Sequence, residues 1–153
     1  MIKIKPHHFM DIIKLYGRGT EVFIPDQRYK HNFYLVANEI INNRRATVQL
    51  TVHKDDICEP CIYSGSGGIC SDGINHIEHI TSKDEWNKIL DKRIMELVQL
   101  FEGSEITASE FCERLYQIRE AIPEIWREED APARKSRQDD FCAGARKYLG
   151  CIL

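Results

Sequence analysis

The sequence has no cysteine in its first 57 residues and no long hydrophobic run anywhere. Its N-terminal residues also lack the small-residue cleavage site of a signal peptide, which argues against secretion and against a membrane-spanning helix. We therefore expect a cytoplasmic protein with no membrane partner. Thiols stay reduced in that compartment, so the six cysteines after residue 57 predict a metal site or reactive groups before disulfides.

Neither sign of charge dominates, since the net charge is −3 and the basic residues are scattered. This balance argues against a nucleic-acid partner. A phosphate-binding P-loop is also missing, because the stretch Gly65–Gly68 has neither the lysine nor the strand–loop–helix context of that motif. The length of 153 residues and the hydrophobic fraction of 42% fit a single domain over residues 1–153.

Hydrophobic periodicity predicts a mainly helical α+β fold, with about five helices and a small two- or three-stranded sheet. Capping boxes at Ser82-Lys-Asp-Glu85 and Thr107-Ala-Ser-Glu110 mark two of the helix starts. Residues 128–138 are polar and are predicted to form a linker. The expected strands cover residues 1–5 and 46–52, and the expected helices cover residues 6–17, 25–41, 83–101, 108–122 and 137–149.

A cysteine-rich cofactor loop is predicted over residues 55–73, which we call the cysteine loop. Cys58 and Cys61 form a C-x2-C pair, and Cys70 follows after eight residues rich in glycine. The pair allows two thiolates to face one ion or cluster across a tight turn, and glycines let the backbone fold close around a cofactor. Three cysteines are one short of a closed tetrahedral site, so the fourth ligand is the open question.

An iron–sulfur cluster, most simply [4Fe–4S], accepts a single thiolate from a distant helix, because the cluster is larger than one ion. Cys142 is the preferred fourth ligand, since it lies in the first turns of a helix whose dipole favours a thiolate. The other two candidates are Cys112, which is predicted to be a buried thiol of the core, and Cys151, which lies next to the C-terminus. A histidine, or no protein ligand at all, stays open as a further alternative.

Zinc is the alternative cofactor, bound by the same cysteines in a non-catalytic structural or interaction module. His76 and His79 follow the cysteine loop and could complete a Cys3His site, although they also read as solvated residues. The acidic pair Asp55 and Asp56 is interpreted as a structural feature that caps free N–H groups of the loop.

His7 and His8 begin the first predicted helix and are the candidate catalytic residues. The N-terminal end of a helix opposes added positive charge, which favours a neutral imidazole. A neutral imidazole can act as a ligand or as an acid/base. Because adjacent residues point in different directions, at most one of the pair is expected to face any single group.

Lys5-Pro6-His7-His8 after a short strand, followed by Asp55-Asp56-Ile57-Cys58, resembles the motif order of an uncharacterised prokaryotic family. That family is catalogued as a domain of unknown function and is often labelled a predicted iron–sulfur-binding protein. It often has a cysteine shortly after the histidine pair, where this chain has Met10 and Asp11. The positions that the resemblance carries over are His7, His8, Asp55, Asp56, Cys58, Cys70, Cys142 and Cys151.

Two functions follow from these expectations. In the first, Cys58, Cys61 and Cys70 hold a cluster. An open iron then acts on a small sulfur-containing substrate in a desulfidase- or lyase-like reaction, or a closed cluster transfers electrons to a redox partner protein. In the second, the same cysteines hold a structural zinc ion.

Overall fold

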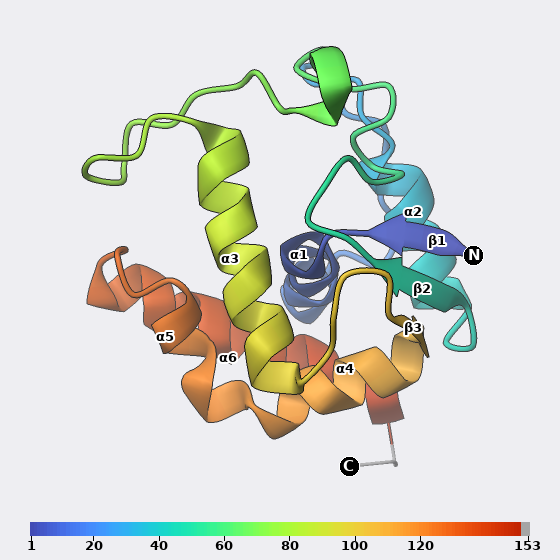
Figure 1. The fold of residues 1–153 in the computed structure, drawn as a ribbon. Helices are drawn as coiled ribbons and strands as arrows, with labels where there is room; N and C mark the ends of the chain where they lie inside the picture. The colour runs from blue at the N-terminus through green and yellow to red at the C-terminus, as the bar shows by residue number, and fades with distance from the viewer. Residues whose placement is uncertain (151–153) are drawn as a thin grey trace.

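The computed structural model describes residues 1–150, and its fold is mainly helical α+β as expected. Figure 1 shows three short strands on one side of the molecule, with helices packed below and beside them. The elements in chain order are β1 (Ile2–Ile4), α1 (Pro6–Gly17), α2 (Phe33–Asn42), β2 (Thr47–Leu50), α3 (Lys83–Val98), β3 (Glu105–Thr107), α4 (Ala108–Gln117), α5 (Ile122–Ile125) and α6 (Ala131–Leu149). Short 3-10 turns occupy Ser66–Gly68 and Arg119–Ala121.

The sheet has the strand order β1-β2-β3. β1 pairs parallel to β2 with Ile4 opposite Leu50, and β2 pairs antiparallel to β3 with Val48 opposite Ile106. The segment from β1 to β2 thus contains a strand, two helices and a second strand, in the order of the residue ranges expected from the sequence. The parallel pairing sets the carboxyl ends of β1 and β2 side by side, which brings the start of α1 next to the start of the cysteine loop.

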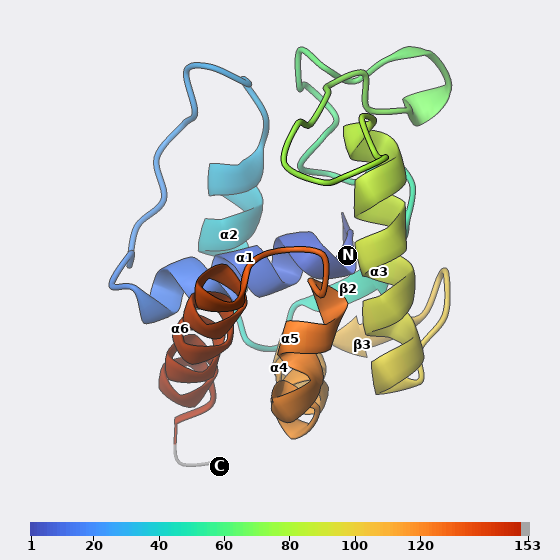
Figure 2. The same cartoon turned by 90° about the vertical axis from the view of Figure 1, so that its left-hand side faces the viewer.

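Helix α1 lies at the centre of the helical layer, in contact with both α6 and α3. Figure 2 shows α1 crossing behind α6, with α3 upright beside it. The crossing with α6 is close because Gly17 and Gly144 face each other there. A Cβ atom on Gly144 would collide with the backbone carbonyl of Ile13. The inner face of α1 includes the fully buried side chains of Phe9, Ile12 and Ile13.

The predicted polar linker over residues 128–138 is wrong beyond Asp130, because α6 begins at Ala131 rather than near residue 137. The Asp130 side chain caps this helix by accepting a 2.8 Å hydrogen bond from the N–H of Ala133, and a proline stands in the first turn. Asp followed by Ala-Pro is a start signal that outweighs the polar composition of the segment.

Three further boundaries differ from the sequence predictions. The second helix begins at Phe33 and not after Pro25, because Asp26 accepts N–H bonds from Arg28 and Tyr29 and so forms a turn. Helix α3 ends at Val98, which leaves Phe101 outside the helical stripe and 74% exposed. The helix expected over residues 108–122 ends at Gln117, and the capping box that opens it at Thr107, the last residue of β3, is present as predicted.

Within residues 1–150, no helix has both the length and the apolar character that crossing a membrane would require.

Candidate metal-cofactor site

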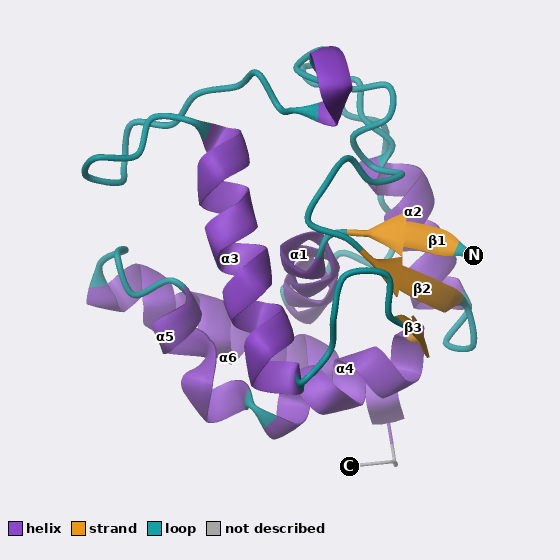
Figure 3. Cartoon of the chain, in the orientation of Figure 1, coloured by secondary structure: helices purple, strands orange, loops and turns teal. Residues whose placement is uncertain are grey.

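The cysteine loop, the start of α1 and the start of α3 surround one pocket of about 510 Å³. In Figure 3 the loop is part of the mostly teal connection from β2 to α3 at the top of the molecule, and it contains the short purple 3-10 turn. The thiols of Cys58, Cys61 and Cys70 line this pocket, and the rings of His7 and His8 line it from α1. The three cysteines and two histidines that the sequence singled out therefore share one cavity.

Asp55 and Asp56 tie the beginning of the cysteine loop to the end of β1. Asp56 exchanges two hydrogen bonds with the backbone of Lys3, at 2.8 and 3.0 Å. Asp55 accepts from the backbone N–H groups of Lys5 and Cys58, at 2.9 and 3.0 Å. Asp55 thus has the capping role expected for the acidic pair and places Cys58 beside the start of α1, whereas the Asp56 side chain bonds β1 instead of the loop.

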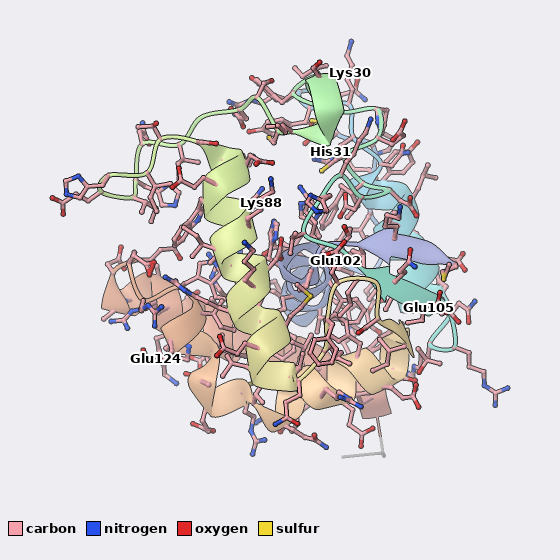
Figure 4. The ribbon with its side chains drawn as sticks, viewed as in Figure 1. Lys30, His31, Lys88, Glu102, Glu105 and Glu124 are labelled. Atoms are coloured by element: carbon pink, nitrogen blue, oxygen red, sulfur yellow. The ribbon has the colours of Figure 1, made fainter. Side chains whose placement is uncertain are left out.

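The segment before α2 forms one rim of the pocket. The N–H of Asn32 donates to the carbonyl of Ile57, and the N–H of Ile62 donates to the carbonyl of Tyr29. His31 stacks on Tyr29 and lines the pocket, and it is labelled beside the cysteine loop in Figure 4. These contacts hold the C-x2-C turn, in which the N–H of Cys61 donates to the carbonyl of Cys58.

The ring of His8 is held by Asp55, with Nδ1 and Oδ2 2.7 Å apart. Burial by itself would raise the pKa of Asp55, but the charge and hydrogen bond of His8 and the Lys5 N–H outweigh it and hold that pKa far below its usual range. Burial lowers the pKa of His8 despite the opposing effect of Asp55. An ionised carboxylate can only accept, so Nδ1 donates and Nε2 keeps a free lone pair.

The ring of His7 is held in the same way by Asp91, which comes from the middle of α3. One oxygen of Asp91 accepts from both the backbone N–H and Nδ1 of His7, each at 2.8 Å. Asp91 is 0% exposed, and its other oxygen has no partner among the described residues. The two imidazole rings lie 4.3 Å apart between centroids. Both histidines are thus fixed through Nδ1 by a buried carboxylate.

Buried polar side chains are concentrated at this pocket. Burial of such groups is costly unless they are paired, so their position in a fold is informative. In residues 1–150 the buried polar or charged residues are Lys5, His7, Thr51, Asp55, Asn87 and Asp91. All of them except Thr51 either line the pocket or hold a histidine that lines it.

Cys58 is the thiol nearest to these groups. A donor atom of Cys58, one of His8 and one of Asp55 lie within 4.8 Å of one another. Burial, reinforced by Asp55, raises the pKa of Cys58 to about 12 against the opposing effect of Lys5. Without a metal this thiol is protonated at neutral pH, and a metal that binds it must displace the proton.

The two expected cofactors place different demands on the positions of the thiols. A zinc ion with tetrahedral Zn–S bonds of about 2.3 Å brings its sulfurs to roughly 3.8 Å from one another. Cys58, Cys61 and Cys70 line one cavity but form no such tight group, since His8, Asp55 and Cys58 are the one close set found among the described residues. Thiols spread around a cavity fit a cluster, which is larger than a single ion.

The other candidate ligands lie elsewhere or make other contacts. Cys142 is buried on α6 near Arg119 and Arg146 and does not line the pocket. Cys112 is fully buried in the core, as the sequence indicated. His76 lines the pocket beside Glu129, whereas His79 is exposed. Cys151 lies outside the described residues.

A family model described as "Protein of unknown function (DUF1284)" matches residues 26–128, which is more than half of the chain. The chain belongs to the DUF1284 family. The DUF1284 match includes the acidic pair and all three cysteines of the cysteine loop, but it begins after His7 and His8 and ends before Cys142. No curated protein and no solved structure matches the chain.

Lys5, Asn87 and Asp91 were not among the site residues expected from the sequence of this DUF1284 protein. A signal for two of them was present. Asn87 and Asp91 are four residues apart and continue in helical register to Ile94 and Val98, so they are polar residues on the buried face of α3. Lys5 was part of the motif Lys5-Pro6-His7-His8, but nothing in the sequence indicated that its side chain is buried, because a lysine in a short strand normally reaches solvent.

Proposed function

We propose that this protein binds an iron–sulfur cluster through Cys58, Cys61 and Cys70, in the pocket between the cysteine loop, α1 and α3. One observation carries the proposal: three thiols of a C-x2-C-x8-C loop line a single cavity together with two imidazoles that buried carboxylates orient. Thiolates are the ligands that iron–sulfur clusters use, and an oriented proton acceptor beside them suits chemistry at the cluster.

The proposed ligand set has three thiolates from residues 1–150. A cluster held by three thiolates supplies an iron that acts as a Lewis acid toward a small substrate, such as one that contains sulfur. His7 and His8 then act as the proton-transfer groups, because each ring has Nδ1 engaged by a carboxylate and its Nε2 lone pair free. Asp91 and Asp55 position these rings without touching the substrate.

Oriented histidines of this kind also favour a second candidate function. His8, Asp55 and Cys58 form the one close group of metal-ligating residues in the described chain, which supports a mononuclear divalent metal such as zinc. Asp55 already accepts three hydrogen bonds, from Lys5, His8 and Cys58, and this reduces its capacity to act as a ligand. We therefore rank this candidate second.

The two candidates are separated by anaerobic purification of the full chain, followed by quantification of iron, zinc and acid-labile sulfide. We expect a brown protein with about four iron and four sulfide per chain. Alanine at Cys58, Cys61 or Cys70 is expected to remove the cofactor, because three thiolates are the minimum that hold it. Cys142→Ala is the matched control and is expected to keep full iron and sulfide content.

Different results would overturn the proposal in identifiable ways. A colourless protein with about one zinc per chain, lost in His8→Ala and Cys58→Ala but kept in Cys70→Ala, would establish the mononuclear site instead. Full iron and sulfide content in any one of the three cysteine-loop variants would refute the assigned ligands. Loss of the cluster in Cys142→Ala would restore the fourth ligand predicted from the sequence.

A further inference from the structure

The Lys5 side chain is 2% exposed and has no carboxylate partner within salt-bridge distance among residues 1–150. Among the described residues, the hydrogen-bond partner of its ammonium nitrogen is Sγ of Cys58, at 3.8 Å. Lys5 lies between β1 and α1 and lines the pocket. A buried ammonium group therefore points at the sulfur of Cys58.

The other cations that line the pocket are all neutralised. Lys14 pairs with Asp11 at 2.9 Å, and Lys83 pairs with Asp72 at 3.2 Å. Arg137 pairs with Glu129 at 3.1 Å. An isolated buried charge costs several kcal/mol unless an opposite charge meets it. Among these four cations, Lys5 alone has no carboxylate within salt-bridge distance in residues 1–150, and its ammonium group faces the thiol of Cys58 instead.

The fold does not require a lysine at this position for its backbone contacts. The bond to Asp55 comes from the backbone N–H of Lys5, which any residue except proline supplies. Only the ammonium group reaches Cys58. The backbone contacts therefore do not explain why residue 5 has a charged side chain, and the role of this charge is to be sought in the pocket.

We propose that Lys5 is the countercharge of the cofactor bound at Cys58, and that its ammonium donates to the Cys58 thiolate and sets the reduction potential. This inference rests on the proposed function above. A cluster with three thiolates is anionic, and its potential depends on nearby charge and on hydrogen bonds to its sulfurs. A positive charge at this distance favours the reduced form, which carries one more negative charge, and strengthens retention of the cofactor.

The test compares Lys5→Met, Lys5→Arg and the control Lys14→Met, each as the full chain purified anaerobically. Methionine fills the space of the lysine stem but has no charge, and arginine keeps the charge. At a fixed applied potential, we expect Lys5→Met to lower the ratio of reduced to oxidised cluster at least tenfold. For a one-electron couple this corresponds to a reduction potential that is about 59 mV more negative. Lys5→Arg and Lys14→Met are expected to stay within threefold of the wild type.

A second readout separates this role from simple packing. Thermal unfolding of the cofactor-free protein should be unchanged or occur at higher temperature in Lys5→Met, since the variant lacks a buried charge that has no ion-pair partner among residues 1–150. Loss of cluster from a stably folded Lys5→Met protein, with the cluster kept in Lys5→Arg, supports the proposal equally.

Three other results would contradict either the role of Lys5 or the proposed function. A Lys5→Met protein with the wild-type cluster content and wild-type potential would overturn the role of Lys5 and leave the proposed function standing. The role of Lys5 would also be overturned if the cofactor-free Lys5→Met protein were unfolded while the cofactor-free Lys5→Arg protein stayed folded. The positive charge would then be needed for folding and not for the cofactor. A wild-type protein without iron and sulfide would instead overturn the proposed function.

Discussion

At the scale of single residues, each histidine of the pocket depends on a carboxylate from a distant part of the chain. Asp55 is 47 positions from His8, and Asp91 is 84 positions from His7. Both carboxylates are buried, so each bond forms in a medium of low dielectric constant and is worth more than at the surface. These bonds fix the tautomer and direction of the rings, as oriented ligands and acid/base groups require.

Replacement of Asp91 tests how strongly the fold relies on one of these pairs. Asp91→Ala leaves the backbone N–H and Nδ1 of His7 without their acceptor inside the protein. We expect the free energy of unfolding to fall by about 3 kcal/mol, as measured by urea denaturation followed by circular dichroism. Asp91→Asn should cost less, because an amide oxygen still accepts one bond.

The control for this prediction is Lys92→Ala, on the exposed side of the same helix. Its effect is expected within about 0.5 kcal/mol. An Asp91→Ala protein as stable as the control would mean that water replaces the carboxylate, and that His7 is not held in place by α3.

At the scale of elements, the helix boundaries follow local chemistry where a capping residue is present. Ser82, Thr107 and Asp130 each accept an N–H bond at the start of a helix. The polar composition of residues 128–138 suggested a linker, and the Asp-Ala-Pro start signal shows why that suggestion failed. The closest helix contact depends on two glycines, Gly17 on α1 and Gly144 on α6.

Substitution of Gly144 distinguishes local helix preference from packing. Helix propensity alone predicts that Gly144→Ala stabilises α6 by about 1 kcal/mol. The collision of the new Cβ with the carbonyl of Ile13 predicts the opposite sign, with a loss of at least about 2 kcal/mol as α1 and α6 separate. Thermal or urea denaturation measures the change.

The exposed neighbour Ala143 supplies the matched control. Ala143→Gly should cost about 1 kcal/mol, from propensity alone. If Gly144→Ala proved more stable than the wild type, the close approach of the two helices would not exist in solution.

At the scale of the whole molecule, the pocket joins segments that have little other reason to stay together. The cysteine loop reaches β1 through Asp55 and Asp56, and it reaches the segment before α2 through Tyr29 and Asn32. Its own regular structure is limited to a 3-10 turn and isolated bridges. A cofactor on three cysteines would therefore act as the centre that orders the loop.

Removal of the cofactor is expected to lower stability locally and globally. A ligand present at 100 times its dissociation constant stabilises the folded state by about 2.7 kcal/mol, so chelation should lower Tm by several degrees. Hydrogen exchange should accelerate at residues 55–73 and remain unchanged at residues 141–149 of α6, a helix that packs against α1 and α4, because these residues do not line the pocket. Equal exchange of the loop with and without the cofactor would contradict this ordering role.

The sequence by itself determined the fold class, the helix starts at the capping boxes of Ser82 and Thr107, and the three cysteines that share a cavity. These features depend on local periodicity, on capping residues and on short spacings between residues, all of which can be recognised in the sequence alone. Only the tertiary structure decided that α3 brings Asp91 to His7, that Lys5 is buried against Cys58, and that Cys142 lies away from the pocket. Such long-range contacts depend on how the helices pack, and packing depends on the shape of the whole core rather than on any one segment.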